Sequence, residues 1–254
     1  MGLPQIPYFC GAKTARMKGT IKLFSTSTVH GSGYLDYAGK AVQKLFQGAE
    51  HVLFVPYARP SGISHEEYYA KAKAKFDDLG IRLLSIHHAN DPKQALVKSE
   101  GIFIGGGNTF VLLRDLYQHG LLDIIKEQVE TGTPYMGTSA GSNVAGLTIN
   151  TTNDMPIVYP PAFEAIQLVD FNLNPHYLDP DPGSTHKGET RETRIKEFHQ
   201  FNTQPVVGLR EGSWLTIQEN EIELEGTLPA RLFFADRAPI EVHPGPITAH
   251  LLAP

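Results

Sequence analysis

From residue 21 onward, short apolar segments alternate with amphipathic segments, and this alternation constrains the fold more than any other feature. Apolar segments of strand length lie at 21–24, 51–55, 81–86, 101–104 and 134–136. Helical spacing of apolar residues is found at 34–46, 64–79, 92–98, 109–117 and 121–129. Strands and helices that alternate in this way form βαβ units around a parallel sheet. We therefore expect an α/β fold with a mostly parallel sheet and helices on both of its faces.

The C-terminal third has a different pattern. Residues 214–225 alternate apolar and polar side chains around Glu219-Asn220, which predicts a β-hairpin. Short strands are expected at 232–234 and 240–242. These strands, at the C-terminal end of the chain, would be antiparallel and appended at an edge of the sheet. Because no low-complexity linker interrupts the chain, we expect residues 21–254 to form a single α/β domain.

The N-terminal segment is treated apart from the fold. Residues 1–20 contain Pro4, Pro7, Gly11 and Gly19 and lack the continuous apolar core of a signal peptide. We expect this segment to be a poorly ordered leader or extension. No apolar run approaches the length of about eighteen residues that a membrane span requires.

Composition narrows the classes of function. The chain has 254 residues, of which 41% are hydrophobic and 19% charged, as in globular proteins. A formal net charge of −5 gives no electrostatic reason to expect nucleic acid or an anionic membrane as a partner. The single cysteine, Cys10, excludes an intrachain disulfide and a cysteine-rich zinc site. We expect a cytoplasmic protein.

Residues 137–143 carry the strongest functional motif. Gly137-Thr138-Ser139-Ala140-Gly141 lies between an expected strand and an expected helix, which is the nucleophile-elbow pattern. A serine at such a sharp turn exposes its hydroxyl, and the flanking glycines allow close backbone approach. The N–H of Ala140 would donate to a developing oxyanion. The alternative is a glycine- and serine-rich turn without chemistry.

A second motif follows the strand at 101–104. Three glycines, 105–107, form a loop without the Lys-Ser/Thr ending of a P-loop or the spacing of a dinucleotide fingerprint. Such a loop can supply the second oxyanion donor opposite a nucleophile elbow. Taken alone, the loop is more typical of a tight turn, whereas its combination with the nucleophile elbow favours the donor role.

A serine nucleophile needs a base, and histidine is the usual one. Among the chain's 11 histidines, local context favours His176, which follows an apolar stretch and the loop-fixing Pro175. The other histidines considered are weaker candidates for the base. Solvated or packed roles are expected for His51, His65, His87 and His88, while His186 lies in a polar loop and His199 on an expected helix. His65-Glu66 lacks a second histidine four residues on, so the zincin pattern is absent.

Five blocks in order carry a family resemblance. They are Gly-Gly-Gly-Asn-Thr-Phe at 105–110, Gly-Thr-Ser-Ala-Gly-Ser-Asn at 137–143, Thr-Thr-Asn-Asp-Met-Pro-Ile-Val at 151–158, Asn-Pro-His at 174–176 and His-Lys-Gly-Glu-Thr-Arg at 186–191. This series resembles peptidase E, the α-aspartyl dipeptidase family, over about residues 21–224. The resemblance implies a fold similar to class I glutamine amidotransferases, with serine in place of their cysteine. It further implies cytoplasmic cleavage of dipeptides with an N-terminal aspartate, without metal or other cofactor.

Position by position, the resemblance makes Ser139 the nucleophile and His176 its base. Gly107 and Ala140 would supply the oxyanion-hole N–H groups. Two carboxylates match positions linked to family activity, Asp154 and Glu211. Asp154 preserves the chain order Ser, Asp, His of the α/β-hydrolases. We favour Glu211 as the orienter of the histidine because it follows the buried-type strand at 206–209. Asp154 would then bind the substrate ammonium or hold the site together.

An Asp-X substrate also brings a side-chain carboxylate into the pocket, and a bidentate arginine is its natural partner. Arg191 is the candidate, with Glu189 as its support or as an ammonium acceptor. Asn108 and Asn143 flank the two oxyanion loops and would add neutral hydrogen bonds. Without the resemblance, residues 187–197 are typical of a helix start with a solvated face of mixed charge.

Two other functions stay open at this point. One is a cyanophycinase-like serine peptidase that cleaves β-aspartyl bonds, and the other is a non-catalytic amidotransferase-like binder of a small metabolite. The expected partner is a small Asp-X peptide, with neither nucleic acid nor membrane, and a homodimer is one possible assembly.

Overall fold

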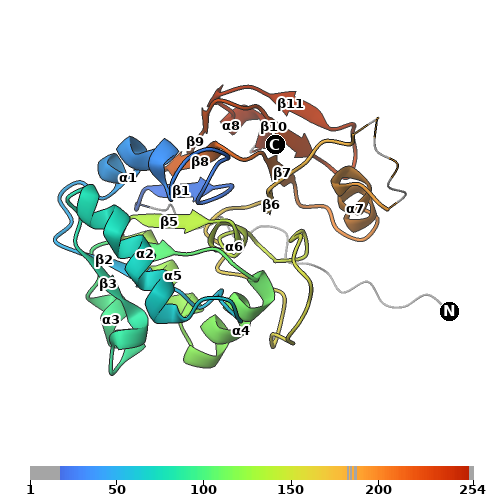
Figure 1. Ribbon diagram of the computed structural model, residues 1–254. Helices are drawn as coiled ribbons and strands as arrows, with labels where there is room; N and C mark the ends of the chain where they lie inside the picture. Colours follow the sequence, from blue (N-terminus) through green and yellow to red (C-terminus); the bar gives the residue numbers. More distant parts are fainter. Residues whose placement is uncertain (1–17, 182, 184, 186–187, 252–254) are drawn as a thin grey trace.

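The computed structural model describes residues 18–181, 183, 185 and 188–251 (Figure 1). Most of the expected N-terminal leader, residues 1–17, lies outside the described residues, and so do Cys10 and His186. No helix in the described part of the chain is long and apolar enough to cross a membrane.

The larger sheet has eight strands in the order β12-β9-β8-β1-β5-β4-β2-β3. Their bounds are β1 Ile21–Phe24, β2 Val52–Val55, β3 Leu83–Ser85, β4 Ile102–Ile104, β5 Tyr135–Thr138, β8 Ser213–Gln218, β9 Glu221–Gly226 and β12 Gly245–Pro246. The strands from β1 to β3 in this order pair in parallel, whereas β8, β9 and β12 pair antiparallel. The expected mostly parallel sheet is confirmed, and so is the β8–β9 hairpin, which lies between β1 and the edge strand β12.

Helices cover both faces of the parallel strands, as the apolar alternation predicts. On β4, Ile102 and Ile104 belong to the cluster of α3, α4 and α5, whereas Phe103 belongs to the cluster of α1 and α2. Because both faces are covered, β4 is buried along its whole length. The bounds are α1 Gly39–Leu45, α2 His65–Asp78, α3 Pro92–Val97, α4 Thr109–His119 and α5 Leu122–Thr131, with the short 3-10 turns η1 Asp36–Ala38 and η2 Ile86–His88.

A second, smaller sheet was not expected from the sequence. It has the order β11-β10-β7-β6, with β6 Asn172–Pro175 and β7 Val206–Leu209 parallel and β10 Ala230–Phe233 and β11 Ile240–Val242 antiparallel. The expected strands at 232–234 and 240–242 therefore exist, but they do not extend the edge of the larger sheet. Short strands carry no local signal for the sheet that they join, because pairing is decided by tertiary packing. The remaining helices are α6 Ala140–Asn143, α7 Arg191–Phe198 and α8 Thr248–Leu251.

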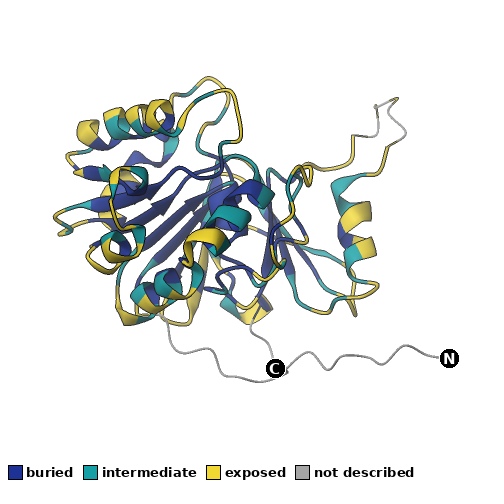
Figure 2. Cartoon of the chain, turned by 90° about the horizontal axis from the view of Figure 1, so that it is seen from below, coloured by how far each residue is buried: buried dark blue, intermediate teal, exposed yellow. Residues whose placement is uncertain are grey.

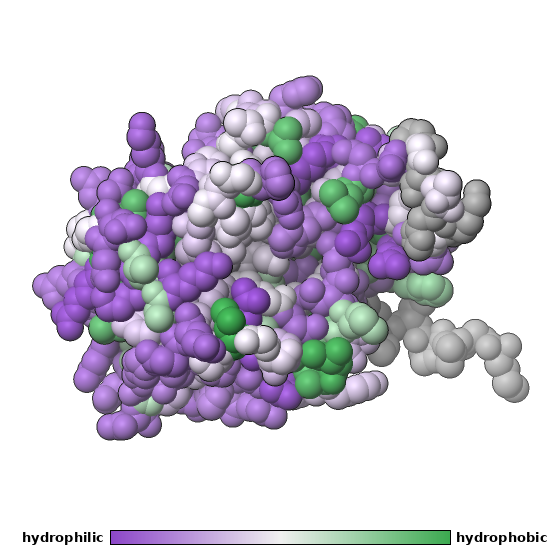
Figure 3. Space-filling view, viewed as in Figure 1, coloured by the Kyte–Doolittle hydropathy of each residue, from purple (hydrophilic) through white to green (hydrophobic). Residues whose placement is uncertain are grey.

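The two sheets share one core. A single hydrophobic cluster contains Leu23 of β1 and also Leu173 of β6, Val207 of β7 and Leu232 of β10. Figure 2 shows the strands as buried and the outer faces of the helices as exposed. The face shown in Figure 3 is mostly hydrophilic, with apolar side chains in small separate groups. The functional motifs are therefore placed around one continuous core.

Candidate active site

Ser139 lies at a strained turn between β5 and α6. Its φ of 52° and ψ of −110° are a conformation that costs a non-glycine residue free energy. A Cβ at Gly137 would lie 2.4 Å from the Gly141 carbonyl oxygen, and one at Gly141 would lie 2.1 Å from the Ile104 carbonyl oxygen. Both glycines are therefore needed for the close packing that holds the serine at the tip of the turn.

Buried hydrogen bonds fix the same turn from beneath. The Ser142 hydroxyl lies 2.7 Å from the carbonyl oxygen of Phe24 and 2.8 Å from that of Gly137. The Tyr135 hydroxyl donates to the Gly141 carbonyl at 2.6 Å. These bonds tie the start of α6 to β1 and β5, so the position of Ser139 is determined by the larger sheet.

His176 bridges Ser139 and Glu211. Its Nε2 lies 2.9 Å from the Ser139 hydroxyl oxygen, and its Nδ1 lies 2.6 Å from Oε1 of Glu211. The side chains of His176 and Glu211 are 38% and 49% exposed. A hydroxyl, an imidazole and a carboxylate in this order form the arrangement that activates a serine for nucleophilic attack.

Both partners of Ser139 come from the smaller sheet. His176 directly follows β6, and Glu211 follows β7 by two residues. Because β6 and β7 are parallel neighbours, their carboxyl ends lie together. His176 also has a positive φ of 55°, which turns the chain sharply at the strand end. The pair is thus assembled by a sheet that the sequence did not reveal.

Ser25 is a buried residue of the site that the sequence analysis missed. It follows β1, and its hydroxyl accepts the His176 N–H at 2.9 Å while donating to the Leu209 carbonyl at 2.7 Å. One side chain of the larger sheet therefore holds the ends of β6 and β7. A serine one residue past a strand has no distinguishing sequence pattern, so only the fold identifies it.

The glycine loop 105–107 lies against the elbow. A Cβ at Gly106 would lie 3.0 Å from the Cβ of Ser139, and one at Gly107 only 2.1 Å from the Ala58 carbonyl oxygen. The N–H of Gly105 donates to Val55 and that of Gly106 donates to the Tyr68 hydroxyl. Within the described residues, the Gly107 N–H has no hydrogen-bond acceptor. It is available for another partner.

Asp154 lies at the start of α4 and not on His176. Its Oδ2 accepts the N–H of Thr109 at 2.7 Å and the Thr109 hydroxyl at 2.6 Å. A carboxylate at a helix N-terminus is stabilised by the free N–H groups there. Just before it, Asn153 donates to the Pro175 carbonyl at 2.7 Å. Asp154 therefore anchors its segment to the start of α4, the helix that follows the glycine loop. Asn153 anchors the same segment to the end of β6.

The two asparagines have structural hydrogen bonds. Asn108 caps α4 by accepting the Val111 N–H, and its amide donates to the Met155 carbonyl at 3.0 Å. Asn143 is 1% exposed and donates to the Leu173 carbonyl at 2.8 Å, which joins α6 to β6. Through these contacts both side chains hold neighbouring parts of the site in position. The burial of Asn143 does not favour a direct contact with substrate.

Arg191 is the first residue of α7 and is half-buried. Desolvation lowers the pKa of its guanidinium, as does the charge of Arg194, whereas the carboxylate of Asp154 opposes this shift. Arg191 forms no ion pair with any other residue that the structure describes. Glu189 is paired with Arg194, at 3.7 Å. A partly desolvated cation within electrostatic range of Asp154 is thus left for a negatively charged ligand.

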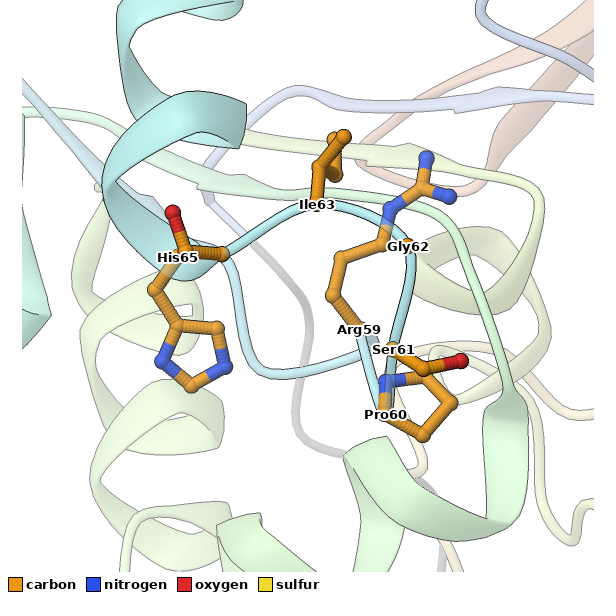
Figure 4. Close-up of a pocket in the computed structure, with 7 residues that line it drawn as sticks. Arg59, Pro60, Ser61, Gly62, Ile63 and His65 are labelled. Atoms are coloured by element: carbon orange, nitrogen blue, oxygen red, sulfur yellow. The ribbon is translucent and has the colours of Figure 1, made fainter.

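A hollow of about 320 Å³ lies nearby, but Ser139, His176 and Glu211 do not line it. It is lined by residues 59–65, and Figure 4 shows Arg59 and His65 pointing away from each other on this loop. The Arg59 guanidinium lies 4.4 Å from the ring centre of Tyr68, the residue that binds the Gly106 N–H. The hollow therefore lies beside Tyr68, whose hydroxyl holds the glycine loop.

Comparison with known proteins identifies close relatives. The model of peptidase family S51 matches residues 21–225. A protein named peptidase E from Streptomyces coelicolor is 47% identical over 230 residues, which cover 91% of this chain and 93% of the relative. A Drosophila melanogaster protein named "Probable alpha-aspartyl dipeptidase" is 49% identical over 225 residues, covering 87% and 92%. The family match confirms the resemblance drawn from the five sequence blocks.

Solved structures share the fold at lower identity. One from Listeria monocytogenes has a TM-score of 0.63 at 22% identity and covers 83% of this chain and 98% of that chain. A peptidase from an acI-B1 actinobacterium has a TM-score of 0.61 at 16% identity, covering 91% and 97%. These likenesses confirm the α/β architecture.

Proposed function

Because the chain belongs to peptidase family S51, we propose that it hydrolyses Asp-X dipeptides by way of Ser139, His176 and Glu211. Its peptidase E relatives give the activity, that of a serine α-aspartyl dipeptidase. The observation that carries the assignment of residues is the placement of His176, 2.9 Å from the Ser139 hydroxyl and 2.6 Å from Glu211.

The reaction is an acyl transfer in two halves. Ser139 attacks the peptide carbonyl carbon while His176 takes the hydroxyl proton at Nε2. The same nitrogen returns the proton to the leaving amine, and the second residue X departs. His176 then takes a proton from a water molecule, which attacks the acyl carbon. The bond to the Ser139 oxygen breaks, that oxygen takes the proton back from Nε2, and aspartate is released. Glu211 holds Nδ1, so that Nε2 faces the serine, and stabilises the imidazolium that forms.

The oxyanion that forms on the peptide carbonyl needs two donors. We assign them to the N–H groups of Gly107 and Ala140. The first has no acceptor among the described residues, and the second is at the start of α6, where helical N–H groups are free. Asp154 supports this role indirectly, since it fixes the helix that follows the glycine loop.

Selectivity for aspartate is assigned to Arg191. A guanidinium binds a carboxylate through two parallel charge-assisted hydrogen bonds, and partial desolvation strengthens them. The half-buried position of Arg191 and its lack of an ion-pair partner among the described residues support this role. Glu189 acts as an ammonium acceptor or as support, and its pairing with Arg194 favours support.

The activity is tested by hydrolysis of Asp-Leu, Asn-Leu and Ala-Leu by the wild type and Ser139→Ala. We expect the wild type to prefer Asp-Leu and the variant to lose kcat by about 10⁶, as in other serine triads. An α- and a β-linked Asp-Leu are compared in the same assay. Preference for the β-linked substrate would identify a cyanophycinase-like specificity instead. Near-wild-type hydrolysis by the variant would contradict the mechanism.

The substrate pocket is tested separately by Arg191→Ala. Loss of a bidentate pair should lower kcat/KM for Asp-Leu by roughly 100-fold and leave Ala-Leu nearly unchanged. Lys196→Ala is the matched control, since Lys196 lies on the same helix, is exposed and pairs with Glu192 outside the proposed pocket. An undiminished preference for Asp-Leu in Arg191→Ala would reject this assignment.

Three further properties are proposed with the activity. Residues 21–254 act as one catalytic domain, because one hydrophobic cluster joins the two sheets. The enzyme acts in the cytoplasm, for which the single cysteine in the sequence is the support, and cell fractionation would check this. A homodimer is supported by exposed apolar side chains such as Tyr159, Phe201 and Met155, and light scattering of the purified chain would measure it.

A further inference from the structure

A cluster of two histidines and one glutamate lies outside the triad. It consists of Glu66, in the first turn of α2, and His87 and His88, in η2 directly after β3. We propose that these three side chains bind a divalent transition-metal cation, with Zn²⁺ the expected ion. The proposal is independent of the peptidase function, because β4 and β2 separate β3 from β5, the strand that Ser139 follows.

The donor atoms already converge on one point. Nε2 of His88 lies 2.6 Å and Nε2 of His87 lies 3.1 Å from the same carboxylate oxygen, Oε2 of Glu66. The three donor atoms all lie within 4.8 Å of one another. A metal ion bound about 2.0–2.2 Å from each donor would fit between them after small side-chain rotations.

Contacts outside the three donor atoms orient the two histidines. Its Nδ1 lies 2.5 Å from the Ser85 hydroxyl, which leaves Nε2 pointing at the cluster. Metal-binding histidines commonly have such a partner on the other ring nitrogen, and it fixes both tautomer and orientation. The ring of Tyr69 packs edge-on against His88, with centroids 5.2 Å apart. The two imidazoles are therefore held in place without the ion.

The donor set selects the metal. Two imidazole nitrogens and one carboxylate oxygen are the ligands of open zinc sites, in which water takes the fourth position. Ca²⁺ and Mg²⁺ prefer oxygen ligands throughout. The side chains of His88 and Glu66 are 49% and 61% exposed, so an ion and its water can enter from solvent.

The site would join two neighbouring units of the fold. Strands β2 and β3 are parallel neighbours, and the three ligands lie on the elements that follow them. The loop 59–65, which lines the hollow of Figure 4, ends one residue before Glu66. A bound ion would therefore clamp the start of α2 and this loop to the end of β3.

The test is titration of ZnCl₂ into the full chain, purified without an affinity tag and treated with a chelator. We expect calorimetry to give one ion per chain and Tm to rise by roughly 5–10 °C at 100 times Kd. Co²⁺ should bind with the visible spectrum of a four-coordinate site. Glu66→Gln and His88→Gln should each weaken Zn²⁺ binding by at least about tenfold, since loss of even an outer partner costs that much.

His250→Gln provides the matched control, because His250 is exposed and outside the cluster. Its Zn²⁺ affinity should equal that of the wild type. Far-ultraviolet circular dichroism and Asp-Leu hydrolysis, both expected to be unchanged, verify that the cluster variants fold. Absence of binding by the wild type would overturn the proposal. Equal binding by the wild type and both cluster variants would overturn it as well, since it would show adventitious binding only.

Discussion

The two sheets of this protein contribute to the triad in different ways. The larger sheet positions Ser139 through backbone packing, because Gly137 and Gly141 leave no room for a side chain and the whole of β5 is buried. The smaller sheet presents His176 and Glu211, whose side chains are 38% and 49% exposed. The proposed nucleophile is thus fixed by steric constraint, whereas the proposed base and its carboxylate are fixed by hydrogen bonds near solvent.

This difference explains where variation should be tolerated. A close-packed turn responds to added volume with a loss of stability, since protein interiors have little free space. When a hydrogen-bonded pair near solvent loses one partner, the proton transfer that it assists becomes slower, whereas the free energy of unfolding changes little. Substitutions that add volume in the first region should therefore affect folding, and substitutions that remove a partner in the second should affect kcat.

Glu211→Gln tests the second region, and the fall in kcat expected for it is the larger one of the two carboxylate variants. The amide no longer stabilises the imidazolium and favours the wrong histidine tautomer, so kcat for Asp-Leu should fall by about 10⁴. Steady-state kinetics measure this, and the free energy of unfolding in urea should stay within about 0.5 kcal/mol of the wild type.

Asp154→Asn is the matched comparison, because it removes one carboxylate from the same site. Asp154 binds the N-terminus of α4, so its loss should cost about 1 kcal/mol of stability and less than about tenfold in kcat. If Asp154→Asn lost as much kcat as we expect for Glu211→Gln, the assignment of the two carboxylates would have to be exchanged.

Gly141→Ala tests the first region. The added Cβ would lie 2.1 Å from the Ile104 carbonyl oxygen, which belongs to the backbone of β4 and cannot rotate away. We expect a loss of about 3 kcal/mol or more in the free energy of unfolding, measured by urea denaturation. Gly39→Ala is the control, since its Cβ would meet only the side chain of Leu79, at 3.3 Å, within a helix. A Gly141→Ala variant as stable as the control would show that the elbow is not close-packed.

The sequence predicted one of these regions better than the other. The elbow, the glycine loop and the parallel strands follow from local patterns, because burial on both faces and sharp turns restrict residue types over a few positions. Local context favours His176 and the family resemblance makes it the base, whereas Glu211 comes from the resemblance. The pairing of β6 with β7 that brings the two together has no local signal. Ser25 was missed for the same reason, since its role depends on contacts 151 and 184 residues away along the chain.

The contact between the two regions gives a more specific effect, which is smaller than those expected for Glu211→Gln and Gly141→Ala. Ser25 follows a strand of the larger sheet, and its hydroxyl binds the His176 N–H and the Leu209 carbonyl of the smaller one. Ser25→Ala leaves two buried polar groups without this partner, at a cost of about 1–3 kcal/mol in stability. If the hydroxyl also positions the base, kcat should fall by about tenfold while KM stays unchanged. Ser99→Ala separates the two effects, because Ser99 is also buried and donates to the Leu96 carbonyl on a helix that carries no triad residue. It should lose stability with wild-type kcat, and a Ser25→Ala variant that behaved identically would show that Ser25 joins the sheets without positioning His176.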